Sequence, residues 1–352
     1  MNSSNRNLEN IEHEVLSITK YRIIIIVMIF TAILMSVSAL CLGRYKIDIL
    51  DILKVFMSKI TDVEHTWDPM TENVIFSLRL PRIIASLLVG SALALSGVTY
   101  QGVFKNPLVS PDLLGISSGA CVGAALAILL GFGSIGIQIS AFTLGIVTVI
   151  LTTTIPKILK NDSITMLVLS GIIISGVMNS IMGIVKYLAD PETQLSAITY
   201  WQMGSLAKVV PQDVLFTVPL ILISTLILML IRWKINILSL GDSEAKSLGL
   251  NIKLTRGITI ICSTMLTACA VCICGTIGWV GLVIPHLGRM IVGPDNVRLL
   301  PISCVLGGMF MLFIDTLARV ITNVEIPLSI LTGLIGAPFY FYILSKQRMK
   351  LS

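Results

Sequence analysis

The chain has 352 residues, of which 55% are hydrophobic and 12% are charged, and its formal net charge is +6. Its mean hydropathy is +0.93. Length alone would allow two soluble domains, but this apolar fraction excludes that reading and indicates one polytopic membrane domain. The positive charge follows from the distribution of Lys and Arg between loops, so it does not call for a nucleic-acid partner.

The seven cysteines do not predict a disulfide framework or a metal site. Their number is odd, and most of them lie inside apolar runs. Cys272 and Cys274 are the only pair that suggests a metal. They are two residues apart on a predicted helix and therefore point to different faces, which argues against a shared ion.

Ten apolar segments are predicted to cross the membrane, since a spanning helix needs about 20 mostly apolar residues. In chain order they are 21–41, 81–103, 113–131, 136–156, 163–185, 214–231, 257–274, 276–288, 302–320 and 327–345. The predicted fold class is all-α and polytopic, with one transmembrane domain over 21–346. Residues 1–20 are predicted to form a cytosolic segment with a short amphipathic helix, and 347–352 a cytosolic tail.

The second and third predicted spans are rich in small residues and are separated by a polar break. The break runs from Gln101 to Asp112 and contains Asn106-Pro107. In lipid, apolar contact alone gives helices no preference for protein over lipid, and small residues let helix backbones approach closely. This pair of segments is therefore predicted to make protein contacts inside the membrane.

The orientation of the chain is predicted from its basic residues. Ten spans place both ends on one side. If that side is the cytosol, 16 of the 25 Lys and Arg residues fall on cytosolic segments, in line with the tendency of these residues to stay inside. Both termini are predicted to be cytosolic, and the chain is expected to be a multi-pass protein of the cell membrane.

Two further segments carry informative patterns. The polar stretch 232–256 contains LGDSEAKSLG at 240–249, where acidic and serine residues precede a closing glycine, a pattern that predicts a short capped helix. The fifth span carries serines and glycines at spacings of three to five residues in 170–183, which predicts one smooth face. That face is either a packing seam or the lining of a path.

Several motifs in a fixed order resemble one transporter family. In the first half they are RLPR at 79–82, SG at 96–97, Gln101, NPL at 106–108 and PDLLGISSGA at 111–120. In the second half they are GTIGWVGLVIPHLGRMIVG at 275–293, LLP at 299–301, IDTLAR at 314–319 and EIPLSILTGLIGAPFYFYIL at 325–344. Together they resemble the FecCD family over about residues 20–346. These are permeases of type II ABC importers for iron–siderophores, haem and vitamin B12. Ser329 departs from the family, which more often has glycine there.

The resemblance implies a set of partners. A second permease copy, as a homodimer, would surround a central translocation path. Two cytosolic ATPases would bind beneath it and an extracytoplasmic solute-binding protein outside, with membrane lipid around. The chain has no GxxxxGK motif followed by Ser or Thr, so it is not itself an ATPase. ATP and Mg would be used by the partner, and no cofactor is expected on this chain.

The resemblance also implies three sites. Arg79, Arg82 and Arg319 would dock the binding protein. The alternatives are anchoring to lipid headgroups or, for Arg319, an i,i+4 pair with Asp315. Residues 238–251 would form the coupling helices that seat in the ATPase, the alternative being an ordinary cytosolic loop. The coupling residues are Gly241, Asp242, Ser243, Glu244, Ala245, Leu248 and Gly249.

The third implied site is the path, which the family places at the fifth and tenth spans. Its candidate residues are Ser175, Met178 and Met182. The remaining motif residues are expected to have structural roles, His286 included, rather than to bind a ligand. They are Gln101, Asn106, Pro107, Pro285, His286, Asp315, Glu325 and Pro327.

The resemblance predicts uptake of an iron complex of the ferric siderophore type. Haem, vitamin B12 or an oxyanion such as molybdate are the alternatives within the family. A secondary transporter would show intramembrane acids or histidines for ion coupling, and the clear case here is Asp315, with Arg319 one turn away. No constellation typical of a membrane-embedded enzyme is visible. A channel is not excluded by composition, but the ordered motifs argue against it.

Overall fold

The structure is a computed structural model that describes residues 17–43, 45–61, 67–161 and 163–349. Every regular element in these ranges is a helix, as the sequence predicts. The elements are α2 (Ile18–Cys41), α3 (Ile49–Met57), α4 (Pro69–Asn73), η1 (Val74–Arg79), α5 (Leu80–Phe104), η2 (Pro111–Leu114), α6 (Ile116–Leu129), α7 (Ser134–Ile158), α8 (Ile164–Leu188), α9 (Gln194–Met203), α10 (Pro211–Leu240), α11 (Asp242–Ser247), α12 (Ile252–Cys274), α13 (Val280–Val292), α14 (Asn296–Val320) and α15 (Leu328–Met349).

Seven helices of the described chain are long and apolar enough to cross a membrane. They are α2, the continuous helix Pro69–Phe104 that ends with α5, and α7, α8, α10, α12 and α14. The other three predicted spans correspond to the shorter apolar helices α6 and α13 and to α15, which is apolar up to Tyr342. Each predicted span therefore has its helix, whereas helix length and composition alone support seven crossings.

Two segments that the sequence indicates as polar loops contain helices. The segment 42–77 holds α3, α4 and most of η1, and the segment 186–213 holds α9. α10 likewise continues to Leu240, nine residues beyond its predicted end at 231. An apolar run predicts only the part of a helix that lies in lipid. The helix itself can extend into polar sequence, because its backbone hydrogen bonds do not depend on apolar side chains.

The ends of the chain lie largely outside the described residues. Of the amphipathic helix predicted within 1–20, the structure describes 17–20, where Ser17 caps α2 by accepting a hydrogen bond from the backbone N–H of Lys20. α15 runs to Met349. The tail predicted for 347–352 therefore begins inside a helix.

α5 is the central helix of the bundle. Twenty of its 25 residues are buried, and it packs against α10, α12, α13 and α14. Small residues allow this. A Cβ added to Gly90 would overlap the carbonyl oxygen of Gly307 on α14 and lie 2.7 Å from the Met311 side chain. A Cβ on Gly97 would likewise overlap the carbonyl oxygen of Gly281 on α13. The small-residue pattern of this span thus predicts its contacts correctly.

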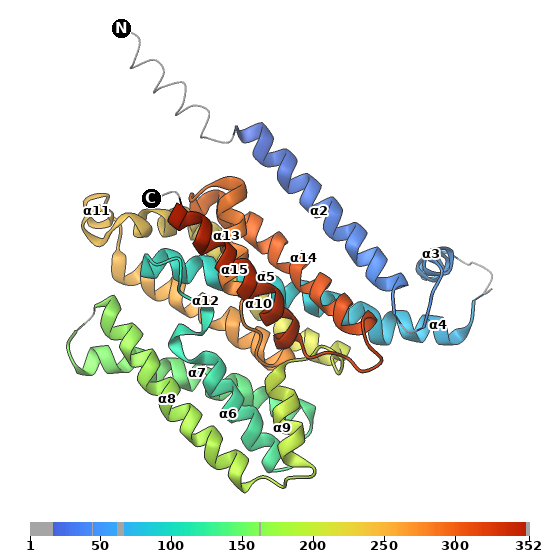
Figure 1. The fold of residues 1–352 in the computed structure, drawn as a ribbon. Coiled ribbons are helices and arrows are strands. Elements are labelled where there is room, and N and C mark those ends of the chain that lie inside the picture. Colours follow the sequence, from blue (N-terminus) through green and yellow to red (C-terminus); the bar gives the residue numbers. More distant parts are fainter. Residues whose placement is uncertain (1–16, 44, 62–66, 162, 350–352) are drawn as a thin grey trace.

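The helices α6, α7, α8 and α9 form a second group beside the central bundle, in the lower part of the view in Figure 1. Glycines again set the spacing, because a Cβ on Gly119 or Gly123 of α6 would overlap α7. The non-helical stretch 105–110 leads from α5 to η2 and the second group, whereas 275–279 joins α12 to α13 within the central bundle. The chain segments after these stretches meet where the ring of Pro111 in η2 lies against Gly281 of α13.

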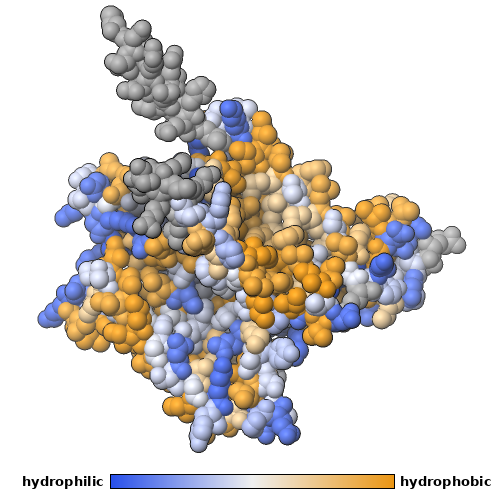
Figure 2. Space-filling view, in the orientation of Figure 1, coloured by the Kyte–Doolittle hydropathy of each residue, from blue (hydrophilic) through white to orange (hydrophobic). Residues whose placement is uncertain are grey.

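The molecule has two polar ends. Figure 1 places α11, the start of α2 and the end of α15 toward one side, and α3 and α4 toward the other. We call these the inner and outer sides. The space-filling view shows an orange apolar surface over the middle of the molecule and blue hydrophilic residues gathered toward both ends (Figure 2). This distribution suits a chain surrounded by lipid.

The α5–α14 crossing predicts a sharp difference between two glycines. We expect Gly90→Ala to lower the thermal midpoint of the detergent-purified protein, because overpacking a tight contact costs about 1–3 kcal/mol. Gly257→Ala on α12 is the control, since a Cβ there meets no atom within 4 Å. Both changes gain similar helix propensity. Equal midpoints in a thermal-shift assay would contradict the crossing.

Candidate functional site

The inner side carries the predicted coupling segment as a short, tethered helix. The chain turns at Gly241, where φ is +150° and a Cβ would overlap the Glu244 carboxylate. α11 follows and stops before Gly249, where φ is +75°. The sequence therefore predicts the short helix and its closing glycine correctly, whereas no side chain caps the start, which follows directly on α10.

Asp242 fixes α11 to the rest of the inner surface. Its carboxylate accepts hydrogen bonds from Lys105 Nζ at 3.0 Å and from Arg256 Nη2 at 2.9 Å. Lys105 follows α5 and Arg256 lies in α12, so one carboxylate joins three elements. The Arg256 hydrogen bond, followed by that of Lys105, lowers the pKa of Asp242. The sequence analysis did not identify either basic partner, because they are 137 and 14 residues away.

The predicted coupling residues differ in exposure. Ala245 is fully buried, so it supports the helix from within and is not available to a partner. This corrects its place among the contact residues. Ser243 and Glu244 are exposed, and Leu248 is 62% exposed. Leu240 is 64% exposed at the same turn and was missed. The inner side thus presents two leucines beside a charged, tethered turn.

Gln101 ties the non-helical stretch 105–110 to α13. Gln101 donates from Nε2 to the carbonyl oxygens of Val109 and Gly281, both at 3.2 Å. Its Oε1 accepts from Arg289 at 2.5 Å. These bonds satisfy backbone groups that no helix serves, which lipid cannot do. Gln101 therefore has the structural role that the sequence analysis predicts.

The other motif residues also have structural positions. Asn106 Oδ1 accepts from the backbone N–H of Leu108 at 2.9 Å, a turn that contains Pro107. Pro285 is buried inside α13, and the next residue, His286, meets the Tyr340 ring edge-on at 6.4 Å between centroids. His286 thus packs against α15. Pro327 directly precedes that helix.

The outer side holds a buried cluster of charges that we call the outer charge cluster: Arg79, Arg82, Asp315, Arg319 and Glu325. Arg82 donates from Nε to both oxygens of Asp315, at 2.9 and 3.0 Å. Its two terminal nitrogens bind Glu325, each at 2.9 Å. Asp315 has no exposed surface. By binding the carboxylates of Asp315 and Glu325, Arg82 of α5 links that helix to α14 and to the segment before α15.

Arg319 and Arg79 complete the outer charge cluster. Arg319 Nε lies 3.4 Å from Asp315 Oδ2, which confirms the predicted i,i+4 pair. Arg79 donates to the carbonyl oxygens of Leu40 and Tyr45. Arg79, Arg82 and Arg319 are 5%, 7% and 8% exposed. In this conformation they do not present free charge to a partner, so their docking role stays a prediction beside an observed structural role.

The three residues predicted for the path face their own subunit. Met178 and Met182 are buried against α6 and α9. A Cβ on Gly115 would lie 2.7 Å from Ser175 Oγ, so that hydroxyl packs at the start of α6. The opposite face of α8 is exposed and carries the small or polar residues Gly176, Asn179, Ser180 and Gly183. The serines and glycines predicted to share one smooth face are therefore divided, since Ser170 and Gly171 are buried whereas those from Gly176 onward are exposed.

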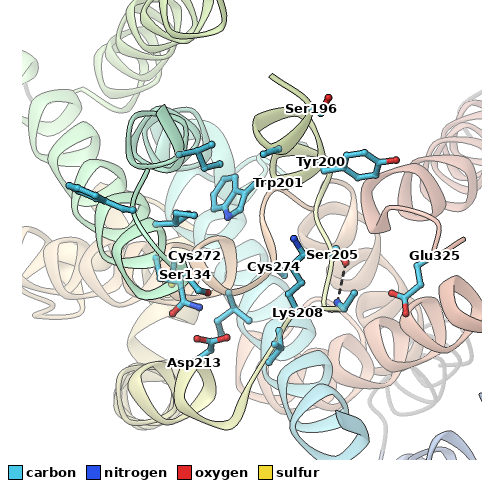
Figure 3. Close-up of a pocket in the computed structure, with 18 of the residues that line it drawn as sticks. Ser134, Ser196, Tyr200, Trp201, Ser205, Lys208, Asp213, Cys272, Cys274 and Glu325 are labelled. Atoms are coloured by element: carbon cyan, nitrogen blue, oxygen red, sulfur yellow. Dashed lines mark hydrogen bonds between the residues drawn. The ribbon is translucent and has the colours of Figure 1, made fainter. Parts of the chain in front are cut away.

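A cavity of about 710 Å³ opens on the outer side between α7, α9 and α12 (Figure 3). Its rim is held by a tight crossing. Gly204 after α9 and Gly275 after α12 both have positive φ, and a Cβ on Gly275 would overlap the carbonyl oxygen of Trp201. Gly204 also accepts from the backbone N–H of Leu328 at 3.0 Å. Of the predicted motif residues only Glu325 lines this cavity, whose wall comes from four separate segments of the described chain, so the sequence did not indicate it.

Comparison with known proteins decides the family. A model of the FecCD transport family matches residues 24–346. The chain belongs to the FecCD transport family. It is accordingly a permease subunit of ABC transporter type, in a family whose members lack an ATPase of their own, and a membrane protein with several apolar helices.

Relatives of this FecCD permease differ in the substrates that they are named for. The molybdate import system permease MolB of Haemophilus influenzae is 41% identical over 90% of this chain and 93% of its own length. A Helicobacter pylori protein that carries the name of an iron chelatin transport system permease is 40% identical over 78% of this chain and 83% of its own. Both relatives support the family, but their names indicate two different substrate classes, an oxyanion and an iron chelate.

A solved structure supports the fold. It is described as an inward-facing conformation of an ABC transporter of metal-chelate type. It matches with a TM-score of 0.83 and 39% identity, covering 92% of this chain and 99% of that one. The helix arrangement of this FecCD permease is thus that of a known transporter subunit.

The outer charge cluster predicts a large asymmetry between two ion pairs. Asp315→Asn leaves Arg82 and Arg319 short of their buried partner, and breaking a buried pair costs about 3–5 kcal/mol. Lys59→Gln removes an exposed pair with Glu72, worth about 0–1 kcal/mol. We expect a much larger fall in thermal midpoint for the first variant. Similar midpoints would show that the outer charge cluster does not support the fold.

The Asp242 tether predicts a pH dependence of α11. Because the folded pKa of Asp242 is lowered below its ordinary 3.8, the tether is fully present above that value and is lost as pH falls through the folded pKa. Hydrogen exchange of α11 amides should therefore show the same protection at pH 7 and pH 5 after correction for intrinsic rates. Asp242→Asn should expose α11 at both values. Protection that falls between pH 7 and 5 in the wild type would contradict the tether.

Proposed function

We propose that this FecCD permease forms the membrane path of an ATP-driven importer for an iron complex of the siderophore type. The match over residues 24–346 carries the transporter class. The iron-complex assignment is supported by the iron chelatin relative and by the metal-chelate type of the matching structure. The relative named for molybdate supports that oxyanion as the second candidate.

In this proposal, two partner ATPases bind the inner side and supply the hydrolysis of ATP. The surface of α11 suits such contact, because Leu240 and Leu248 are exposed beside a helix that Asp242 ties to α5 and α12. A displacement of α11 by the ATPase would be transmitted to α5 and α12 through the Asp242 ion pairs, whereas the displacement of an untethered loop would not be. We propose that both termini lie in the cytosol on this inner side, as the distribution of basic residues predicts.

A second copy of the chain completes the path in this proposal. We assign the lining to the exposed face of α8, with Gly176, Asn179, Ser180 and Gly183, in place of the buried Met178 and Met182 and the partly buried Ser175. The residues assigned to this exposed face form a small, polar stretch that leaves room for a hydrated substrate, and the exposed Ile172 and Tyr187 flank it on the same side of the helix. α15 is the other helix that the family resemblance assigns to the path.

The solute-binding protein is proposed to dock on the outer side, near the outer charge cluster. Glu325 holds both terminal nitrogens of Arg82, and its side chain is 32% exposed. A carboxylate of the partner can therefore reach Arg82 only by displacing Glu325. Docking would thus release the segment before α15, which connects recognition outside to the helix proposed to line the path.

The proposal is tested by uptake into proteoliposomes that contain the permease, its ATPase and its binding protein. We expect ATP-dependent uptake of a radioactive ferric siderophore and none of radioactive molybdate. Leu248→Asp should abolish uptake and co-purification of the ATPase, whereas Leu53→Asp, an equally accessible leucine of α3 on the outer side, should keep the ATPase bound. Uptake of molybdate alone would replace the iron assignment, and normal uptake by Leu248→Asp would remove the coupling role.

A further inference from the structure

The cavity between α7, α9 and α12 has the size of a pocket for an organic ligand. Its volume of about 710 Å³ falls in the range of about 300–1,000 Å³ typical of such sites. Apolar side chains form much of the wall, among them Phe132, Ile137 and Ile273. A bare tetrahedral oxyanion would leave most of this volume empty and would gain nothing from those walls.

Three side-chain nitrogen donors of the cavity are unused by the described part of the chain, besides the hydroxyls of residues such as Ser196. Gln138 is 8% exposed and lines the cavity, yet its amide has no hydrogen-bond partner among the described residues. The indole N–H of Trp201 likewise has none there. Lys208 extends into the cavity (Figure 3), and no described carboxylate lies within ion-pair distance of its amine. Lys208 is exposed and Trp201 is partly exposed, so water in the open cavity can reach these donors, and the oxygens of a ligand would take the place of that water.

The two acidic residues of the cavity are already engaged. Asp213 accepts at Oδ2 from the backbone N–H of Val210 at 3.0 Å, and Glu325 gives both oxygens to Arg82. The donors that remain favour a ligand with several oxygen acceptors. Hydroxamate, catecholate and carboxylate groups have such oxygens, and the organic bodies that carry them suit apolar walls.

We propose that this cavity is a binding site for an oxygen-rich organic chelate, with Gln138, Trp201 and Lys208 donating to its oxygens. The proposal rests on the proposed import of an iron complex and adds a binding site that residues of one chain form. The Tyr200 and Trp201 rings lie on the side of the cavity formed by α9 (Figure 3), where they can stack on an aromatic chelate.

The test measures binding of a radioactive ferric tris-catecholate to the permease–ATPase complex in phosphatidylcholine nanodiscs, without binding protein. We expect Gln138→Leu and Lys208→Gln each to raise Kd about tenfold or more, as the loss of one such hydrogen bond implies. Lys157→Gln, an exposed lysine at the other end of α7, should bind like the wild type. Size-exclusion profiles and basal ATPase activity show whether each variant is folded.

Three outcomes would overturn the site. Wild-type Kd in both folded variants would show that these donors do not hold the chelate. Displacement of the chelate by molybdate at equal affinity would show an oxyanion site, and displacement on adding phosphatidylglycerol to the nanodiscs would show a lipid site. The uptake assay separates this proposal from the transport proposal. If the two variants lose chelate binding as expected but the wild type imports only molybdate, the iron assignment is rejected and the binding site stands.

Discussion

Close backbone contact at α5 is the constraint on which the structure depends. Gly90 meets Gly307, and Gly97 meets Gly281, at positions where one added carbon would overlap a carbonyl oxygen. In lipid, helices gain little from apolar contact alone, so packing at short range must supply the preference for protein neighbours. These two crossings also position other contacts. α13 carries Arg289, which binds Gln101, and α14 carries Asp315 and Arg319 of the outer charge cluster.

The same helix joins the two ends of the molecule. Arg82 lies in its first turn and binds Asp315 and Glu325, while Lys105 follows its last turn and binds Asp242. A helix of 25 residues spans about 37 Å at 1.5 Å per residue. A single rigid, buried element therefore connects the proposed docking side to the proposed coupling side, and both connections are ion pairs that a partner can compete for.

Breaks in the helices create the features that chemistry can use. The stretches 105–110 and 275–279 leave backbone groups without helical partners. Gln101, held by Arg289, donates to the carbonyl oxygen of Val109 in the first stretch and to that of Gly281 just after the second. Non-helical backbone at membrane depth is tolerated only where protein or water satisfies it. The turn at Gly275 also brings α12 against α9 and so frames the outer cavity. The proposed functional features of this FecCD permease thus lie at helix ends, and the long continuous helices hold them in position.

The sequence by itself determined the all-α class, the ten apolar helices in order, the small-residue contacts of α5, the short helix at 242–247, the Asp315–Arg319 pair and the family. All of these depend on neighbours in the chain or on local composition. Only the tertiary structure decided that Arg79 and Arg82 are buried, that Met178 and Met182 pack inward and that Ala245 is core. Each of those depends on which face of a helix meets another helix. The partners Lys105 and Glu325 are 137 and 243 residues from the groups that they bind, and a one-dimensional pattern carries no record of such contacts.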